Sequence, residues 1–230
     1  MRFQLFVLLF GVLFVMAGCP GTAVLLDNDD ATTPDEDDDT DSVCATNAPC
    51  NGGFVIQNEN DLDEIALCVT ITSGLSFLTG DWLSSLDLPC LESVGGNLYL
   101  YFNAALTSLD LPNLTTVGGG LNIAGNDNLS NLAGFPGLTT VGGFLTIDDN
   151  AALTSLDMYS LTTVGDDLHI TSNAALTSLD GLFSLTSVGG GVDIHDNACL
   201  SEVQAETFAA SISVGGGVSV WGNGANYPCP

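Results

Sequence analysis

The sequence has almost no positive charge. Its 230 residues include 28 Asp and Glu but a single basic residue, Arg2, and the formal net charge is −27. Binding to DNA or RNA depends on Lys and Arg side chains that neutralise phosphates, and attraction to anionic lipid head groups depends on the same side chains. We therefore expect no nucleic-acid partner, whereas a neutral or cationic partner is compatible with the charge.

Residues typical of catalytic sites are also scarce. The chain has only two histidines, His169 and His195. It has no nucleophile elbow, no phosphate-binding Gly motif followed by Lys and no Cys-x-x-Cys metal pattern. These absences indicate a protein that is not an enzyme and that needs no cofactor.

The beginning of the chain has the features of an export signal. Arg2 precedes an apolar run that is short for a membrane span, which needs about 20 residues, and that fits a signal peptide. The end of the run, Met16-Ala17-Gly18-Cys19, resembles a bacterial lipobox. The resemblance implies that residues 1–18 are a lipoprotein signal peptide and that Cys19 carries acyl chains such as palmitate, which anchor the protein in a membrane. Secretion without a lipid is the alternative.

The residue after the lipobox bears on localisation. Pro20 follows Cys19, where an Asp would favour retention in the inner membrane. The resemblance to bacterial lipoproteins therefore implies the outer membrane of the cell envelope. Exposure at the cell surface and a position facing the periplasm both stay open.

Residues 19–43 are predicted to be a lipidated, acidic, disordered tether. Nine acidic residues lie between Pro20 and Val43, with the run Asp35-Glu36-Asp37-Asp38-Asp39 at the centre. Such a segment repels itself and has too few large apolar residues to bury a core. Loose calcium binding is the alternative, although the spacing of an EF-hand is missing.

The sequence after residue 50 is repetitive. Each repeat contains Val-Gly-Gly-x-Leu-x-Ile or a close variant, ends with Asn, and recurs after 23–26 residues. A period in this range is typical of solenoid proteins, in which one repeat forms one coil. The six repeats begin at Val94, Val117, Val141, Val164, Val188 and Val214.

Each repeat predicts one short strand. The alternating Leu-x-Ile pair places two side chains toward the core, and a Leu-x-x-Leu segment such as Leu106 to Leu109 is expected to form the opposite wall. We expect the Gly pair to form a tight turn with positive φ, and the Asn to bond the backbone of neighbouring turns. The inward pairs are Leu98 and Leu100, Leu121 and Ile123, Leu145 and Ile147, Leu168 and Ile170, and Val192 and Ile194. The Asn positions are Asn103, Asn126, Asn150, Asn173, Asn197 and Asn223.

The Val-Gly-Gly-x-Leu-x-Ile-x-x-Asn repeat resembles that of the receptor L domain family. The segment from Cys50 to Ile56, followed by Asp61-Leu62 and Cys68, resembles the beginning of that domain. The resemblance implies a repeat solenoid over residues 44–230, a right-handed, leucine-rich-repeat-like β-helix with one strand per coil. It is expected to be mostly β, with short helices at residues 61–67 and 202–210. The second repeat, Leu75-Ser76-Phe77, departs from the pattern because it lacks the Gly pair and the Asn.

Six cysteines remain after Cys19, an even number that suits an oxidising compartment. The resemblance implies a disulfide between Cys50 and Cys68. Cys199 occupies the position of Ala105, Ala152 and Ala175 in other repeats, which we expect to point inward. Its partner is expected to be Cys229, near the C-terminus, and Cys44 is then left to pair with Cys90.

The outward strand positions are the candidate binding face. Two columns are expected, Tyr99-Asn122-Thr146-His169-Asp193-Ser219 and Tyr101-Ala124-Asp148-Thr171-His195-Trp221. Aromatic side chains on an open sheet often stack on sugars or on partner side chains. A polar sheet without a ligand, with Trp221 covered by the cap, is the alternative. The residues proposed to form the face are Tyr99, Tyr101, Asp148, His169, Asp193, His195 and Trp221.

Part of this face is a weak candidate for a metal site. Neighbouring coils lie about 4.8 Å apart, so His169 is expected beside Asp193, with His195 and Asp148 on the diagonals. Two imidazoles and a carboxylate are ligands that suit a zinc-like ion.

These observations favour a lipid-anchored, extracytoplasmic, monomeric binding or adhesion module that recognises an unknown protein or glycan. A structural protein of the cell envelope without a discrete ligand is the alternative.

Overall fold

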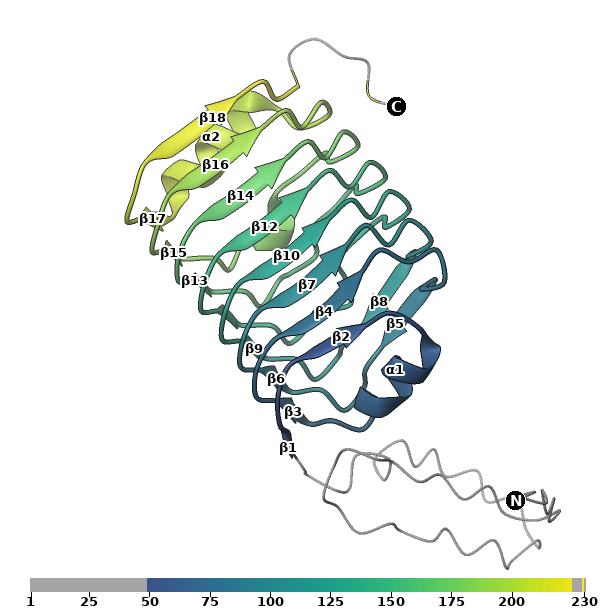
Figure 1. Cartoon of the computed structure of the whole chain (residues 1–230). Helices are drawn as coiled ribbons and strands as arrows, with labels where there is room; N and C mark the ends of the chain where they lie inside the picture. Colours follow the sequence, from purple (N-terminus) through teal and green to yellow (C-terminus); the bar gives the residue numbers. More distant parts are fainter. Residues whose placement is uncertain (1–48, 225–228, 230) are drawn as a thin grey trace, which may run out of the picture.

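The chain winds into a stack of coils (Figure 1). The computed structural model describes residues 49–224 and residue 229. The predicted signal peptide (1–18), the lipidation site Cys19 and the predicted tether (19–43) lie outside the described residues and stay predictions.

The longer strands of the coils form one parallel sheet. Its order is β18-β16-β14-β12-β10-β7-β4-β2, and equivalent positions of successive repeats lie side by side, as in Leu121 beside Leu145. The departing second repeat still forms a regular strand of this sheet. The strands are β2 (Phe54–Ile56), β4 (Leu75–Leu78), β7 (Leu98–Tyr101), β10 (Leu121–Ala124), β12 (Leu145–Asp148), β14 (Leu168–Thr171), β16 (Val192–His195) and β18 (Val218–Trp221).

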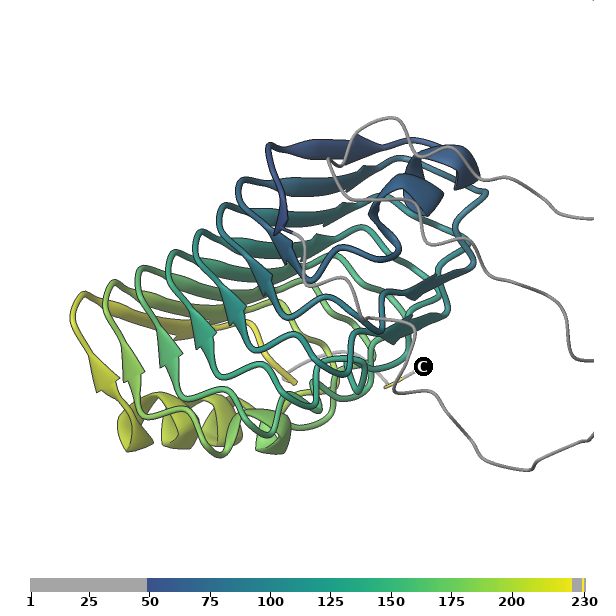
Figure 2. The ribbon, with the colours of Figure 1, turned by 90° about the horizontal axis from the view of Figure 1, so that it is seen from below.

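A second sheet of two-residue strands lines another side of the stack (Figure 2). Its strands are β1 (Pro49–Cys50), β3 (Thr70–Ile71), β6 (Ser93–Val94), β9 (Thr116–Val117), β11 (Thr140–Val141), β13 (Thr163–Val164), β15 (Ser187–Val188) and β17 (Ser213–Val214). A third, two-stranded sheet joins β5 (Ser85–Asp87) to β8 (Ser108–Asp110), and a 3-10 turn, η1, spans Asp180–Leu182. The predicted solenoid of receptor L domain type is confirmed, and most coils add a second short strand to the one predicted.

The core consists of the predicted apolar columns. The inward Leu, Ile and Val side chains of strands β7 to β16 are at most 1% exposed, and Leu106 and Leu109 of the opposite wall are also buried. Burial of one such side chain contributes roughly 2 kcal/mol. The inward apolar side chains of a single coil would stay exposed to water above and below the coil. They become buried only when neighbouring coils stack on it.

The role predicted for the glycine pairs is wrong. The glycines with positive φ are Gly52, Gly125, Gly222 and Gly224, and none of them belongs to the Gly pairs of the six repeats that begin at Val94. The first glycine of each pair instead lies against the carbonyl of its counterpart in the preceding coil. A Cβ on Gly142 would stand 2.3 Å from the Gly118 oxygen, and one on Gly118 would stand 2.4 Å from the Gly95 oxygen. The pair is needed because coils approach too closely for a side chain, which the sequence of one repeat does not reveal.

The left-handed backbone conformation occurs at another position of the repeat. In most repeats this position directly precedes the Asn. Gly takes this conformation without strain, whereas other residues pay a steric penalty of about 1–2 kcal/mol. Its occupants are Phe102, Gly125, Asp149, Ser172, Asp196 and Gly222, and Thr79 takes the equivalent position in the second repeat, where Gly80 stands in place of the Asn.

The six asparagines form a continuous buried ladder. Each is at most 1% exposed. The Asn150 amide donates to the carbonyls of Ile123 and Asp148, both at 3.0 Å, and its Oδ1 accepts from the backbone N–H of Asn126 at 3.1 Å. The same pattern repeats along the stack, so the predicted backbone-bonding role is confirmed. Glu202 ends the ladder by accepting the N–H of Asn223 at 2.9 Å.

Short helices lie at both ends. The helix α1 spans Glu59–Ile65, two residues before the predicted range, because the Asn58 side chain caps it by accepting from the N–H groups of Asn60 and Asp61. The helix α2 spans Glu202–Ser211 and matches its predicted range within one residue. Neither α-helix within residues 49–224 has the length and apolarity that crossing a bilayer requires.

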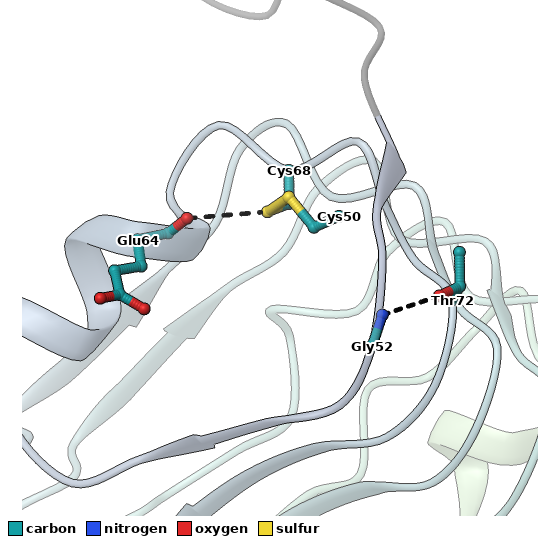
Figure 3. Close-up of a disulfide and its surroundings, with 5 residues drawn as sticks. All are labelled: Cys50, Gly52, Glu64, Cys68 and Thr72. Carbon is teal, nitrogen blue, oxygen red and sulfur yellow. Dashed lines mark hydrogen bonds between the residues drawn. A yellow bond between two sulfur atoms is a disulfide. The ribbon is translucent and has the colours of Figure 1, made fainter. Parts of the chain in front are cut away.

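Two predicted disulfides are present. Cys50 is bonded to Cys68 beside α1, where the Gly52 N–H also donates to Thr72 Oγ1 at 3.0 Å (Figure 3). Cys199 is bonded to Cys229, with a Cα–Cα distance of 5.1 Å. Cys90 is disulfide-bonded, but Cys44 lies outside the described residues, so their pairing stays a prediction.

The inward direction predicted for Cys199 is wrong. Cys199 and its counterparts Ala105, Ala152 and Ala175 are only half-buried. The buried positions of this corner are the ladder Asn and the Leu three residues later, as in Asn150 and Leu153. The chain turns between these two residues, which leaves the intervening side chains at the surface of the corner.

Replacement of Asn150 with Ala is expected to destabilise the fold by about 3 kcal/mol or more, because it leaves buried partners on two neighbouring coils without hydrogen bonds. Denaturant unfolding followed by circular dichroism measures the change. Asn128→Ala is the control, since this exposed Asn makes one bond, to the Ala104 carbonyl, and should cost less than about 1 kcal/mol. Equal losses in the two variants would contradict the role of the ladder.

Replacement of Gly142 with Ala is expected to cost about 1–3 kcal/mol, because the added methyl group forces two coils apart. Gly217→Ala is the matched control, as a Cβ there meets no atom within 4 Å. The control should be neutral or stabilise by up to about 1 kcal/mol. Thermal unfolding of both variants distinguishes close coil packing from a requirement for glycine flexibility, which would affect both sites alike.

Candidate functional site

The outward face of the longer sheet has the predicted register. Tyr99 lies beside Asn122, Asn122 beside Thr146, and His169 beside Asp193, and the second column is aligned in the same way from Tyr101 to Trp221. Most of these side chains are half-buried, while Ala124 is buried and Trp221 is 50% exposed. The face is therefore a shallow, varied surface on a regular frame.

Near its N-terminal end, on and directly after β7, this face carries three aromatic rings in a row. Tyr99 and Tyr101 stack with ring centroids 5.2 Å apart and an interplanar angle of 19°. Phe102 continues the row, 6.3 Å from Tyr101. Such a row presents broad apolar ring surface beside phenolic hydroxyls, a combination that suits sugars and amphipathic side chains.

Phe102 was not among the predicted site residues. Its φ of 52° is left-handed, and its ring is 58% exposed. A bulky residue rarely adopts this conformation, and strained residues gather at functional sites. The next coil makes room for the ring, since a Cβ on Gly125 would stand 2.4 Å from it. The contact of Phe102 with Gly125 depends on how neighbouring coils align, which the sequence does not show directly. A bulky side chain directly before the Asn of the repeat is the sequence feature that could have indicated Phe102 as a site residue.

A hydrogen-bonded side chain positions the first ring of the row. The Asn97 amide donates to the Tyr99 hydroxyl, and its Oδ1 accepts from the Gly120 N–H of the next coil at 2.7 Å. Burial raises the pKa of the Tyr101 phenol, and the neighbouring Tyr99 adds to the rise. The Tyr101 hydroxyl is therefore a neutral donor and acceptor at physiological pH.

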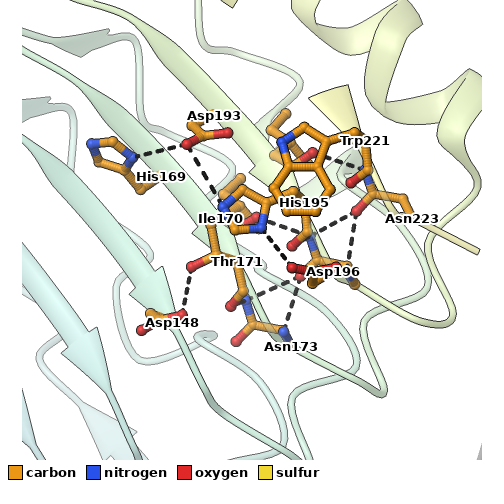
Figure 4. A network of polar contacts seen from close by, with 12 residues as sticks. Asp148, His169, Ile170, Thr171, Asn173, Asp193, His195, Asp196, Trp221 and Asn223 are labelled. Carbon is orange, nitrogen blue, oxygen red and sulfur yellow. Dashed lines mark hydrogen bonds and ion pairs between the residues drawn. The ribbon is translucent and has the colours of Figure 1, made fainter. Parts of the chain in front are cut away.

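The opposite end of the face combines a histidine, a tryptophan and carboxylates (Figure 4). The His195 and Trp221 rings stack with centroids 4.3 Å apart and an interplanar angle of 10°. His195 Nδ1 lies 3.0 Å from Asp196, and its Nε2 lies 3.7 Å from Asp193. Both ring nitrogens thus face carboxylates, and neither is directed at a nucleophile. The half-exposed Trp221 is not hidden by the cap.

The structure does not support the weak metal candidate. Asp193 Oδ2 lies between the imidazoles, 4.0 Å from His169 Nδ1 and 3.7 Å from His195 Nε2. Asp148 is not in this cluster, because it accepts a hydrogen bond from Thr171 Oγ1. Within the part of the chain that the structure describes, no three His, Cys, Asp or Glu side chains are arranged to hold a metal ion. The Asp193 carboxylate instead lies between the two imidazole rings.

The two aromatic ends are separated by a polar strip. Five strand spacings of about 4.8 Å place Tyr101 and Trp221 about 24 Å apart. Asn122, Thr146 and Asp148 lie between them. Since Arg2 is the only basic residue of the chain, no Lys or Arg in this face attracts an anion. The surface suits an extended, neutral or cationic partner.

Comparison with known proteins places the repeats in a family. No curated protein and no solved structure matches the chain. The family model of the receptor L domain matches residues 68–207, which is more than half of the chain and includes β7, β10, β12, β14 and β16. The chain therefore belongs to the receptor L domain family.

Proposed function

We propose that this protein is a lipid-anchored adhesion module that binds a neutral or cationic glycan or protein on the outward face of its longer sheet. Receptor L domains are non-enzymatic, ligand-binding extracellular modules. The aromatic row of Tyr99, Tyr101 and Phe102 is the observation that carries the proposal for this chain.

Three features of the row support a binding role. Exposed Phe102 adopts a left-handed conformation, and Gly125 leaves space for its ring. Asn97 holds Tyr99 within the same coil and is itself fixed by the Gly120 N–H of the next coil. The repeat itself does not require three bulky rings, since the same positions of the next coil hold Asn122, Ala124 and Gly125. Preorganised aromatic side chains reduce the entropy that binding costs.

The charge of the protein restricts the ligand. With 28 acidic residues and one basic residue, the surface repels nucleic acids and polyanionic glycans. Neutral sugars stack on aromatic rings without charge complementarity, and cationic protein segments are attracted by Asp148, Asp149 and Asp193. These are the two ligand classes that the face favours.

The proposed anchor rests on the N-terminal sequence. Cys19 follows the apolar segment and its small residues, and the acidic region up to Val43 separates it from the solenoid. This arrangement supports a solenoid held outside the cytoplasm at a distance from an outer membrane.

Replacement of Tyr101 with Ala is expected to weaken glycan or protein binding by about thirtyfold, equivalent to about 2 kcal/mol, as for an interface aromatic hot spot. The measurement is a glycan array, followed by titration of the best ligand by calorimetry, together with capture of envelope proteins. Tyr159→Ala is the matched control, because Tyr159 is 50% exposed but lies outside both long sheets.

The outcome separates the proposal from a purely structural role. Saturable binding that survives Tyr159→Ala and is lost with Tyr101→Ala supports a binding module. Binding that is equally strong in both variants places the ligand elsewhere. If no glycan or envelope protein binds saturably, the chain is better described as a structural component of the envelope.

Acylation of Cys19 is expected in the bacterial membrane fraction. Mass spectrometry of the N-terminal peptide should find Cys19 as the first residue, with a mass increased by acyl chains. Cys19→Ser should move the protein out of the membrane fraction because it removes the acceptor thiol. A mature chain that begins elsewhere and carries an unmodified Cys19 would contradict the anchor.

A further inference from the structure

The last coil of the solenoid leaves two sheet edges open. β17 and β18 are the terminal strands of the two eight-stranded sheets, and among the described residues each pairs only with the strand before it. Within residues 49–224, no strand pairs with the backbone N–H and C=O groups on the outer edge of β18. Such an edge is a template for pairing with another strand.

The same coil exposes part of the apolar core. Val218 continues the inward column of Leu168 and Val192, which are 0% and 1% exposed, but Val218 itself is 52% exposed. Val214 and Val220 continue two other inward columns and are only half-buried. Core residues thus lie uncovered at this end, next to the open edge.

The opposite end of the solenoid is closed. Ile56 and Cys50, in the first strands of the two sheets, are 1% and 2% exposed. Ile65 of α1 is also buried, and the Cys50–Cys68 disulfide ties α1 to the first coil. Pro49 in β1 lacks a backbone N–H, which weakens this edge as a template. The two ends are therefore not equivalent, and among the described strands the edge at the C-terminal end is the better template for pairing.

The two strands at the C-terminal end, β17 and β18, carry no charged side chain, and the nearest carboxylates on the adjoining helix α2 are Glu202 and Glu206. The last 24 residues, from Thr207 to Pro230, contain no Asp, Glu, Lys, Arg or His, although the whole chain carries a net charge of −27. Edge strands that avoid association are commonly protected by charged side chains or Pro, and β18 has neither. Two copies of this chain repel each other least where this end meets itself.

We propose that two copies of this chain associate through their C-terminal ends, with the β18 edges paired antiparallel about a two-fold axis. An isologous contact of this kind uses the same surface twice and closes as a dimer. The pairing must keep inward side chains on the inner side of the joined sheet. Ser219 then faces Ser219 of the second copy, and Val218 faces Val220. The contact covers the exposed core valines and leaves the aromatic row near the far end free.

This dimer has a consequence for adhesion. The consequence depends on the lipid anchoring proposed above, whereas the dimer itself does not. The anchor precedes β1, whereas the dimer contact is at β18, the other end of the stack. Two associated copies thus carry their anchors at opposite ends and connect two membranes. Vesicles that carry the acylated chain should then cluster. Failure of acylation would abolish clustering but not the dimer in solution.

Replacement of Val218 with Asp is expected to raise the dissociation constant of the dimer by at least about tenfold, because two carboxylates are brought together at the contact. Val55→Asp is the matched control, since Val55 is also 52% exposed but lies at the closed end. Sedimentation velocity of the full chain in detergent, over a concentration series, measures the mass. Both variants add one negative charge and retain the N-terminal segment, so differences between them report on the C-terminal end.

A cross-linking experiment tests the register. Ser219→Cys should form a disulfide-linked dimer under mild oxidation, whereas Thr146→Cys, an outward position in the middle of the sheet, should not. A single-chain mass at all concentrations, the monomer that the sequence favours, would overturn the proposal. So would a dimer that Val218→Asp and Val55→Asp affect equally, or equal cross-linking at positions 219 and 146.

Discussion

The close, in-register stacking of coils is the constraint on which the rest of the structure depends. Parallel pairing places each residue beside its counterpart in the next repeat, as Leu121 lies beside Leu145. Where backbones meet most closely, as between Gly118 and Gly142, there is no space for a side chain. Where the chain turns into the core, the asparagine ladder satisfies backbone groups that would otherwise be buried without partners. Glycines and asparagines thus repeat for reasons that arise between coils.

This frame explains why the outward face can vary. The inward columns and the asparagine ladder set the position of each strand, so outward side chains contribute little to folding. Tyr99, Thr146 and Asp193 occupy equivalent positions in one column although they share no chemistry. The same frame allows a strained residue such as Phe102, because the neighbouring coil supplies the space that its ring needs. Repeat proteins combine an invariant core with a variable surface in this way.

Charge acts on a larger scale than these contacts. An excess of acidic side chains keeps copies of the protein apart and disfavours anionic partners. The terminal strands β17 and β18 are the exception because they carry no charged side chain, and there an inward column of the core ends at the half-exposed Val218. The two ends of the stack therefore have different properties: one is closed by α1 and a disulfide, and the other presents an open edge. This polarity gives the solenoid a direction relative to the proposed anchor on its N-terminal side.

The sequence by itself determined the repeat, the inward columns, the asparagine ladder and two disulfides. Alternation and period depend only on the order of residues along one strand, and Cys50 and Cys68 lie in a recognisable opening motif. It also indicated Tyr99, Tyr101, His195 and Trp221 as outward residues. The stacking of the rings, the separation of Asp148 from the histidines and the role of the glycine pairs were decided only by the tertiary structure. These features depend on distances between atoms in different coils, and such distances exist only once the coils are stacked.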